Sequence, residues 1–141
     1  ELLVVVAIIG ILAAVGVVAY SGYTAGAKKS AVKSNQAAVV KYVAAELKKC
    51  EIGETSVMGT NLTCSQRKTS GKVKDGTNSA LGSEFKNPYS TASSAIVTTT
   101  LTACNATTEG QTSVSDDGTT VTIKSCTANG ETLLSNTVTI E

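Results

Sequence analysis

The sequence predicts an α+β protein, in which a long N-terminal α-helix packs on a four-stranded antiparallel β-sheet head. Three observations predict this fold. Residues 2–20 carry no charge, residues 32–47 place apolar side chains at helical spacing, and residues 94–141 alternate β-branched and polar residues around turn signals. A helix and a sheet that each have one apolar face bury those faces against one another, so both halves are expected to share one core.

The first half of the helix is apolar on every side. The nineteen residues from Leu2 to Tyr20 are free of charge. At 1.5 Å per residue they would span about 28 Å, close to the roughly 30 Å hydrocarbon core of a bilayer. This run is longer than the apolar region of about 7–15 residues in a secretory signal. We therefore expect residues 1–24 to form a transmembrane or filament-core helix, with the single carboxylate of Glu1 at its edge.

The second half of the helix, residues 25–50, is amphipathic. Its apolar side chains recur at spacings of seven, four and four and form one stripe with lysines around it: Val32, Val39, Val43 and Leu47. No proline interrupts the helix, and Gly53 is a stop signal. The stripe needs a partner surface, which the later strands are expected to supply.

The globular head is expected to comprise residues 25–141. After the helix, residues 51–93 are rich in Gly, Ser, Thr and Asn and are predicted to form an irregular loop. Residues 94–141 are predicted to form the antiparallel sheet. Asp117-Gly118 and Asn129-Gly130, each between β-branched runs, are hairpin signals.

Four cysteines lie beyond the apolar segment: Cys50, Cys64, Cys104 and Cys126. No pair has CxxC spacing and the chain has no histidine, so we expect no metal site. Two disulfides in an oxidising compartment are the better interpretation, and four free thiols in a cytosolic domain are the alternative. Of the three possible pairings we favour Cys50–Cys64 and Cys104–Cys126, because each closes a short loop between neighbouring elements.

The charges differ between the second half of the helix, here called the stem, and the rest of the head, residues 50–141. Residues 28–49 carry six lysines against one glutamate, a net of +5, and residues 50–141 carry six basic and nine acidic side chains, a net of −3. This balance does not indicate nucleic acid as the main partner, and the stem lysines are interpreted as a solvated or inter-subunit face. Asp116-Asp117-Gly118 could ligate calcium, but a turn between strands is the simpler interpretation.

Catalysis is not expected. Without histidine, a Ser-His or Cys-His nucleophile is excluded, and no Gly-rich phosphate-binding loop occurs. The sequence therefore predicts a protein that is not an enzyme and needs no cofactor.

The N-terminal stretch ELLVVVAIIGILAAV resembles the N-terminal signature of type IV pilins and of the related pseudopilins of type II secretion. In that family a short basic leader is cleaved to expose an N-methylated residue, usually Phe, and a glutamate follows four residues later. By that comparison Glu1 matches the family's glutamate, and four residues, typically Phe-Thr-Leu-Ile, are expected in front of it. The close match covers roughly residues 1–30. The remainder matches only in layout.

The resemblance implies a subunit that polymerises into a filament through its apolar helix. Glu1 would pair with the methylated N-terminal amine of a neighbouring subunit and fix the axial register. A carboxylate resting at the lipid headgroups, where the helix dipole favours it, is the alternative role. The implied partners are other copies of the chain, the inner membrane before assembly, prepilin peptidase and the pilus assembly machinery. The implied location is first the inner membrane and then the cell surface.

The chain departs from the family's pattern at Val18, where many pilins carry proline. In the family the helix often melts between the glycine that matches Gly10 and that proline. Here Gly10 and Gly16 each weaken the helix by about 1 kcal/mol, but no proline is present. Any extension in a filament is therefore expected to be shallow and confined to residues 10–18.

Two other functions remain open. One is the major pseudopilin of a type II secretion system, a short periplasmic piston. The other is a monomeric, membrane-anchored binding domain. A pilus subunit of this kind would be compatible with motility, adhesion, DNA uptake or secretion.

Overall fold

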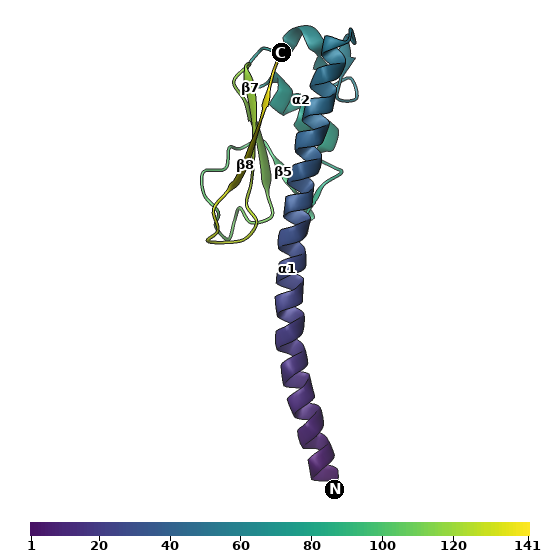
Figure 1. Ribbon diagram of the computed structural model, residues 1–141, viewed down its shortest axis with the longest axis vertical. Coiled ribbons are helices and arrows are strands. Elements are labelled where there is room, and N and C mark those ends of the chain that lie inside the picture. The colour runs from purple at the N-terminus through teal and green to yellow at the C-terminus, as the bar shows by residue number, and fades with distance from the viewer.

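The computed structural model describes residues 1–141 and has the shape of a rod with a head attached along one end (Figure 1). The rod is α1, a single helix of 50 residues from Leu2 to Glu51. At 1.5 Å per residue it is about 75 Å long. The N-terminus lies at the free end of the rod, far from the head, and the C-terminus lies beside the other end (Figure 1).

The end of α1 confirms the stop expected at Gly53. The backbone N–H of Glu54 donates to the carbonyl of Lys49 at 3.1 Å, and that of Gly53 donates to Cys50 at 3.4 Å. This pair of bonds satisfies carbonyls in the last turn of the helix. Gly53 has a φ of 106°, a conformation that side chains with a Cβ rarely adopt.

The predicted apolar stripe of α1 forms part of the core. Val32, Val39 and Val43 are fully buried, and Leu47 is 3% exposed. One cluster of buried residues joins the stripe to the rest of the head: Val39, Val43, Leu47, Val57, Met58, Leu62, Cys64, Val73, Leu81, Ile96, Val114, Val121, Ile123 and Ile140. The helix and the sheet therefore share one core, as expected from their patterns.

The main sheet has four strands in the order β5-β6-β7-β8. Their bounds are Ile96–Val97, Thr112–Asp116, Thr120–Ser125 and Leu134–Thr139. The last three strands pair antiparallel, but β5 pairs parallel with β6, with Ile96 opposite Thr112. The prediction of an entirely antiparallel sheet is therefore wrong at β5. The connection of residues 98–111 is long enough to return the chain in the same direction, which a tight hairpin cannot do.

The prediction of an irregular loop over residues 51–93 is also wrong. This region contains a second helix and two small antiparallel pairs, with bounds α2 Lys72–Leu81, β1 Ser56–Val57, β2 Leu62–Thr63, β3 Lys86–Asn87 and β4 Ser90–Ser94, and a 3₁₀ turn at Cys64–Gln66. The helix buries Val73, Thr77 and Leu81, which are spaced by four residues. Their period is a helical signal that the surrounding Gly, Ser and Asn residues obscure.

A glycine lets α2 pack closely on the preceding segment. A Cβ atom at Gly76 would lie 3.1 Å from both the Leu62 Cβ and the Met58 Sδ. Glycine weakens a helix interior by about 1 kcal/mol, so the residue type at position 76 by itself disfavours a helix. Tertiary contact outweighs that local preference.

The two turn signals differ in outcome. Asp117-Gly118 connects β6 to β7 as a hairpin, with Asp116 opposite Val121 and Gly118 at a φ of 86°. Asn129-Gly130 lies in a turn closed by a 3.1 Å hydrogen bond from the Glu131 N–H to the Ala128 carbonyl. That turn belongs to the longer connection of residues 126–133 and does not join two strands directly.

The two helices cover different parts of the sheet. The second half of α1 packs mainly on β7 and β8, and α2 packs mainly on β6. β8 forms one edge of the sheet and contacts α1. The head therefore surrounds only the C-terminal half of the rod.

Candidate assembly surface

The N-terminal half of α1 exposes apolar side chains around its whole circumference. Every residue from 1 to 23 is exposed. The large aliphatic side chains expose 51–84% of their surface: Leu2, Leu3, Val4, Val5, Val6, Ile8, Ile9, Ile11, Leu12, Val15, Val17 and Val18. By length and composition α1 is able to cross a membrane. A surface this apolar is typical of a site that contacts lipid or other protein chains.

Glu1 lies at the far end of this surface. It occupies the N-cap position of α1, where its carbonyl accepts a hydrogen bond from the Val5 N–H at 3.3 Å. Its carboxylate makes no capping hydrogen bond. It is therefore available to a group from another molecule.

The two glycines singled out in the sequence lie within regular helix. α1 continues without a break through Gly10 and Gly16. A Cβ atom built at either position would meet no other atom within 4 Å. Within one subunit, therefore, nothing packs closely enough against these positions to require glycine.

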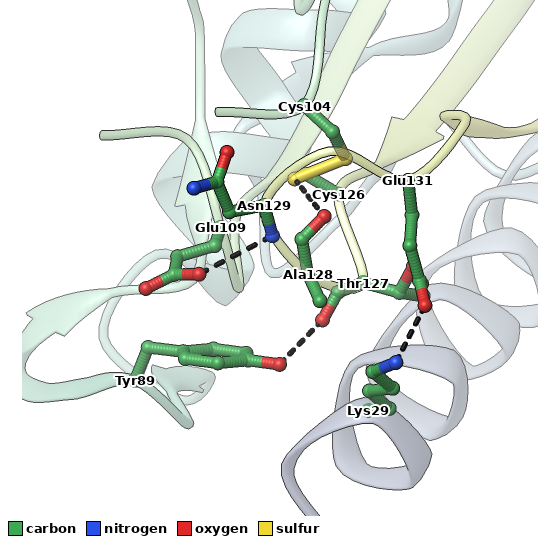
Figure 2. A network of polar contacts seen from close by, with 9 residues as sticks. All are labelled: Lys29, Tyr89, Cys104, Glu109, Cys126, Thr127, Ala128, Asn129 and Glu131. Atoms are coloured by element: carbon green, nitrogen blue, oxygen red, sulfur yellow. Dashed lines mark hydrogen bonds and ion pairs between the residues drawn. A yellow bond between two sulfur atoms is a disulfide. The ribbon is translucent and has the colours of Figure 1, made fainter. Parts of the chain in front are cut away.

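A polar network ties the head to α1 just beyond the exposed half (Figure 2). The Lys29 Nζ donates to Glu131 Oε1 at 2.5 Å, and the Thr127 hydroxyl donates to the other carboxylate oxygen of Glu131. The hydroxyl of Tyr89 donates to the Thr127 carbonyl at 2.6 Å. The hydrogen bond from Lys29 is the main reason that the pKa of Glu131 lies below its usual value. The network holds the connection between β7 and β8 against the stem.

The cysteines form two disulfides, in the pairing that the loop lengths favour. Cys50 bonds to Cys64, with 5.3 Å between their Cα atoms, and links the last turn of α1 to the end of β2. Cys104 bonds to Cys126, with 5.2 Å between their Cα atoms, and links the 98–111 connection to the end of β7 (Figure 2). The second disulfide adjoins the network around Glu131.

The paired aspartates after β6 bond to backbone N–H groups. Asp117 Oδ1 accepts from Thr120 at 2.7 Å and from Thr119 at 2.8 Å, and these bonds lower the pKa of Asp117. Asp116 accepts from Gly71 and Lys74. Both carboxylates are therefore used to hold turns and a helix end, which favours the structural interpretation of this motif.

Residues that sequence reasoning missed act through long-range contacts. Lys29 and Glu131 are separated by 102 positions, and no local pattern marks such a pair.

Glu46 lies beside the apolar stripe and is only 7% exposed. Its carboxylate accepts from the backbone N–H of Met58 and pairs with Lys49. The sequence does contain one signal for Glu46, because this acidic residue follows Val43 by three positions and Val39 by seven and so lies on the buried side of the helix.

The site residues predicted from the sequence fall in two separate places. Glu1, Gly10 and Gly16 lie along the exposed half of α1, whereas the cysteines lie in the head.

Comparison with models of protein families, with curated proteins and with solved structures gives no match to this chain.

Proposed function

We propose that this chain is the structural subunit of a bacterial type IV pilus, in which the N-terminal halves of α1 bundle and the heads form the outer surface. The observation that carries the proposal is the fully exposed apolar half of α1 with one carboxylate, Glu1, at its end. The resemblance of ELLVVVAIIGILAAV to the pilin signature supports the same function. The subunit has a structural role and performs no catalysis.

The exposed half of α1 needs an apolar environment. Burying one large aliphatic side chain contributes about 1.5–3 kcal/mol, and a dozen such residues are exposed here. A lipid bilayer supplies that environment to a single subunit, and in this proposal the bilayer is the inner membrane before assembly. A bundle of identical helices supplies it after assembly. The head, attached only to the other half of α1, leaves room for neighbouring helices.

Glu1 gives the bundle a defined register. A carboxylate in an apolar bundle costs several kcal/mol unless a cation pairs with it. In the proposed filament that cation is the N-terminal amine of a neighbouring subunit. Only one axial offset between neighbours brings the two groups together, so the pair selects that offset.

The membrane and the assembly machinery are the remaining proposed partners. Prepilin peptidase would process the precursor, and the assembly machinery would extract the subunit from the inner membrane into the growing filament. The polar surface of the head, rich in Ser and Thr, would then face the outside of the cell.

The proposal is tested by expressing the precursor of this chain, with its leader, in a bacterium with pilus assembly machinery and examining the material sheared from its surface. Long surface filaments composed mainly of this chain are expected in electron micrographs. Short filaments confined to the periplasm would instead indicate a type II secretion pseudopilin, which shares the N-terminal signature. Detergent-free material that sediments only as single subunits would indicate a membrane-anchored monomer.

A further inference from the structure

A groove of about 490 Å³ lies between α1 and the edge strand β8. Lys33, Gln36, Val40 and Lys41 line it from α1, and Ser135 and Asn136 line it from β8. It lies outside the apolar N-terminal surface, so the filament bundle proposed above does not account for it.

The edge of β8 is open along this groove. β8 ends the strand order of the sheet, and every second residue of such a strand directs its N–H and C=O away from the sheet. Its sequence, LSNTVT, contains none of the charged residues or prolines that usually protect an edge from pairing. This edge therefore offers a template for an additional strand.

The side of the groove contains a buried polar group without a partner. Gln36 is 3% exposed, and its Nε2 donates to Asn136 Oδ1 at 2.8 Å. Its carbonyl oxygen, Oε1, is buried and accepts no hydrogen bond. Val40, half-buried next to the core cluster, adds an apolar surface nearby. A segment that enters the groove therefore covers a part of the core that is only half-buried, beside the buried Gln36 side chain.

Two lysines determine the charge of the occupant. Lys33 and Lys41 are both exposed, and neither belongs to any of the ion pairs of the chain. They are eight residues apart on α1, which corresponds to about 12 Å along the helix. A strand covers about that distance in four residues. Because four is an even number, residues at that spacing point to the same face of a strand.

We propose that this groove binds an extended acidic segment of another protein, which adds to β8 as an antiparallel or parallel strand. The segment carries two carboxylates four residues apart, directed at Lys33 and Lys41, with an apolar side chain midway between them over Val40. No two carboxylate side chains of the present chain are four residues apart. Residues 1–141 of a second copy therefore lack the required pattern, and the occupant that we propose is a different protein.

The test uses the full chain in non-ionic detergent micelles at low salt and a fluorescein-labelled peptide, Thr-Thr-Glu-Thr-Val-Thr-Glu-Thr-Thr. Saturable binding is expected in fluorescence anisotropy. Hydrogen exchange at residues 134–139 should slow at least tenfold when the peptide is bound, since strand addition protects the outer amides of β8. Binding without any slowing at these residues would overturn strand addition.

Charge exchange tests the two lysines. The double variant Lys33→Glu/Lys41→Glu should bind the peptide at least tenfold more weakly, and a peptide with Lys in place of both Glu should bind this variant better than it binds the unaltered chain. The matched control is Lys72→Glu/Lys86→Glu, which changes the net charge equally at two exposed lysines outside the groove. An equal loss in the control would overturn the assignment of the groove.

Two further outcomes would overturn the proposal. A peptide whose two Glu residues are three apart should bind more weakly, because its second carboxylate points away from α1; equal affinity would contradict the spacing argument. Self-association of the chain without peptide, abolished by Lys33→Glu/Lys41→Glu, would identify a second copy as the occupant instead. Since binding is measured on single subunits, its failure would leave the filament proposal unaffected.

Discussion

The carboxylate of Asp116, at the end of β6, caps the first turn of α2 by accepting the backbone N–H of Gly71 at 2.6 Å. Its second oxygen accepts the N–H of Lys74 at 2.7 Å. The first N–H groups of a helix have no partner within the helix, and α2 has no capping side chain of its own. The negative charge also suits the positive end of the helix dipole. One side chain from the sheet thus holds the start of α2 in place.

The first prediction concerns this cap. Asp116→Ala should lower the free energy of unfolding of the head by about 1–2 kcal/mol, since two backbone donors lose their acceptor. Asp116→Asn should lose less, because its single carbonyl oxygen can still accept one bond. The measurement is urea unfolding of the full chain in non-ionic detergent. Glu84→Gln, at an exposed site whose side chain forms none of the ion pairs of this fold, is the control, and a loss no larger than the control's would contradict the role of Asp116.

The second prediction concerns the pH dependence of stability. Burial raises the pKa of the Glu46 carboxyl, but hydrogen bonds from Lys49 and the Met58 N–H and the charge of Lys49 outweigh burial and leave the pKa below its usual value. A carboxyl with a lowered pKa in the folded state stabilises that state above its unfolded pKa, about 4.3 for Glu. This contribution is lost as the pH falls below about 4.3 and through the folded pKa.

Glu46→Gln should therefore reduce the free energy of unfolding at pH 7 by about 1–3 kcal/mol, because the Met58 N–H loses a charged acceptor. The difference between this variant and the unaltered chain should narrow at acidic pH. Urea unfolding at several pH values between 7 and 2.5 measures both effects. A difference that stays constant over that range would show that the Glu46 charge does not contribute to the acid dependence.

The third prediction concerns the disulfides. In the chain-entropy model, joining cysteines at sequence separations of 14 and 22 should stabilise the head by about 3 kcal/mol for each disulfide. The variants Cys50→Ala/Cys64→Ala and Cys104→Ala/Cys126→Ala test the pairs separately. Only the second should speed hydrogen exchange at residues 126–133, since that loop carries Glu131. Non-reducing peptide mapping should give the same two pairs, and a Cys50–Cys126 or Cys64–Cys104 peptide would contradict this connectivity.

The features predicted correctly from the sequence are those with a local pattern. The apolar stripe of Val32, Val39, Val43 and Leu47 is visible as a period, and the turn at Asp117-Gly118 is visible as a dipeptide. The exposed half of α1 follows from its composition alone. Period, turn chemistry and composition each act over a few residues, so the linear sequence contains them in full.

The features that were missed depend on residues far apart in the chain. α2 lacks a capping residue of its own and contains Gly76, and its stability relies on Asp116 and on close packing against Leu62. The parallel pairing of β5 depends on the path of residues 98–111. The groove beside β8 depends on where α1 crosses the sheet. None of these contacts has a signature within one segment, which is why sequence patterns could not reveal them.

The fourth prediction concerns Glu1 and rests on the filament proposal. Glu1→Ala or Glu1→Gln removes the charge that pairs with the neighbour's amine and leaves that amine unpaired among apolar side chains, at a cost of about 3–5 kcal/mol per subunit. Surface filaments should be absent or scarce in electron micrographs, while immunoblots of membranes show the subunit at normal levels. Abundant filaments of the Glu1→Ala chain would refute a role of Glu1 in register.

The last prediction concerns the helix between Gly10 and Val18. In the single subunit this stretch is regular helix, as a lipid-embedded segment must be to satisfy its backbone groups. In a filament, neighbouring helices supply other contacts, so a local extension becomes possible where the two glycines weaken the helix. We expect any extension in a filament structure to lie within residues 10–18. An extended stretch that reaches past Tyr20 would contradict this confinement.

A proline at position 18 tests why the extension is shallow. Val18→Pro removes one backbone donor and places a ring against the preceding turn, which costs a helix interior about 3 kcal/mol. The variant should therefore show a longer extended stretch in electron cryomicroscopy of its filaments, with filament yield close to that of the unaltered chain. Val18→Ala keeps the N–H and is the matched control, which should leave the stretch unchanged. If Val18→Pro filaments keep a regular helix through Gly10 and Gly16, backbone hydrogen bonding is not what limits the extension.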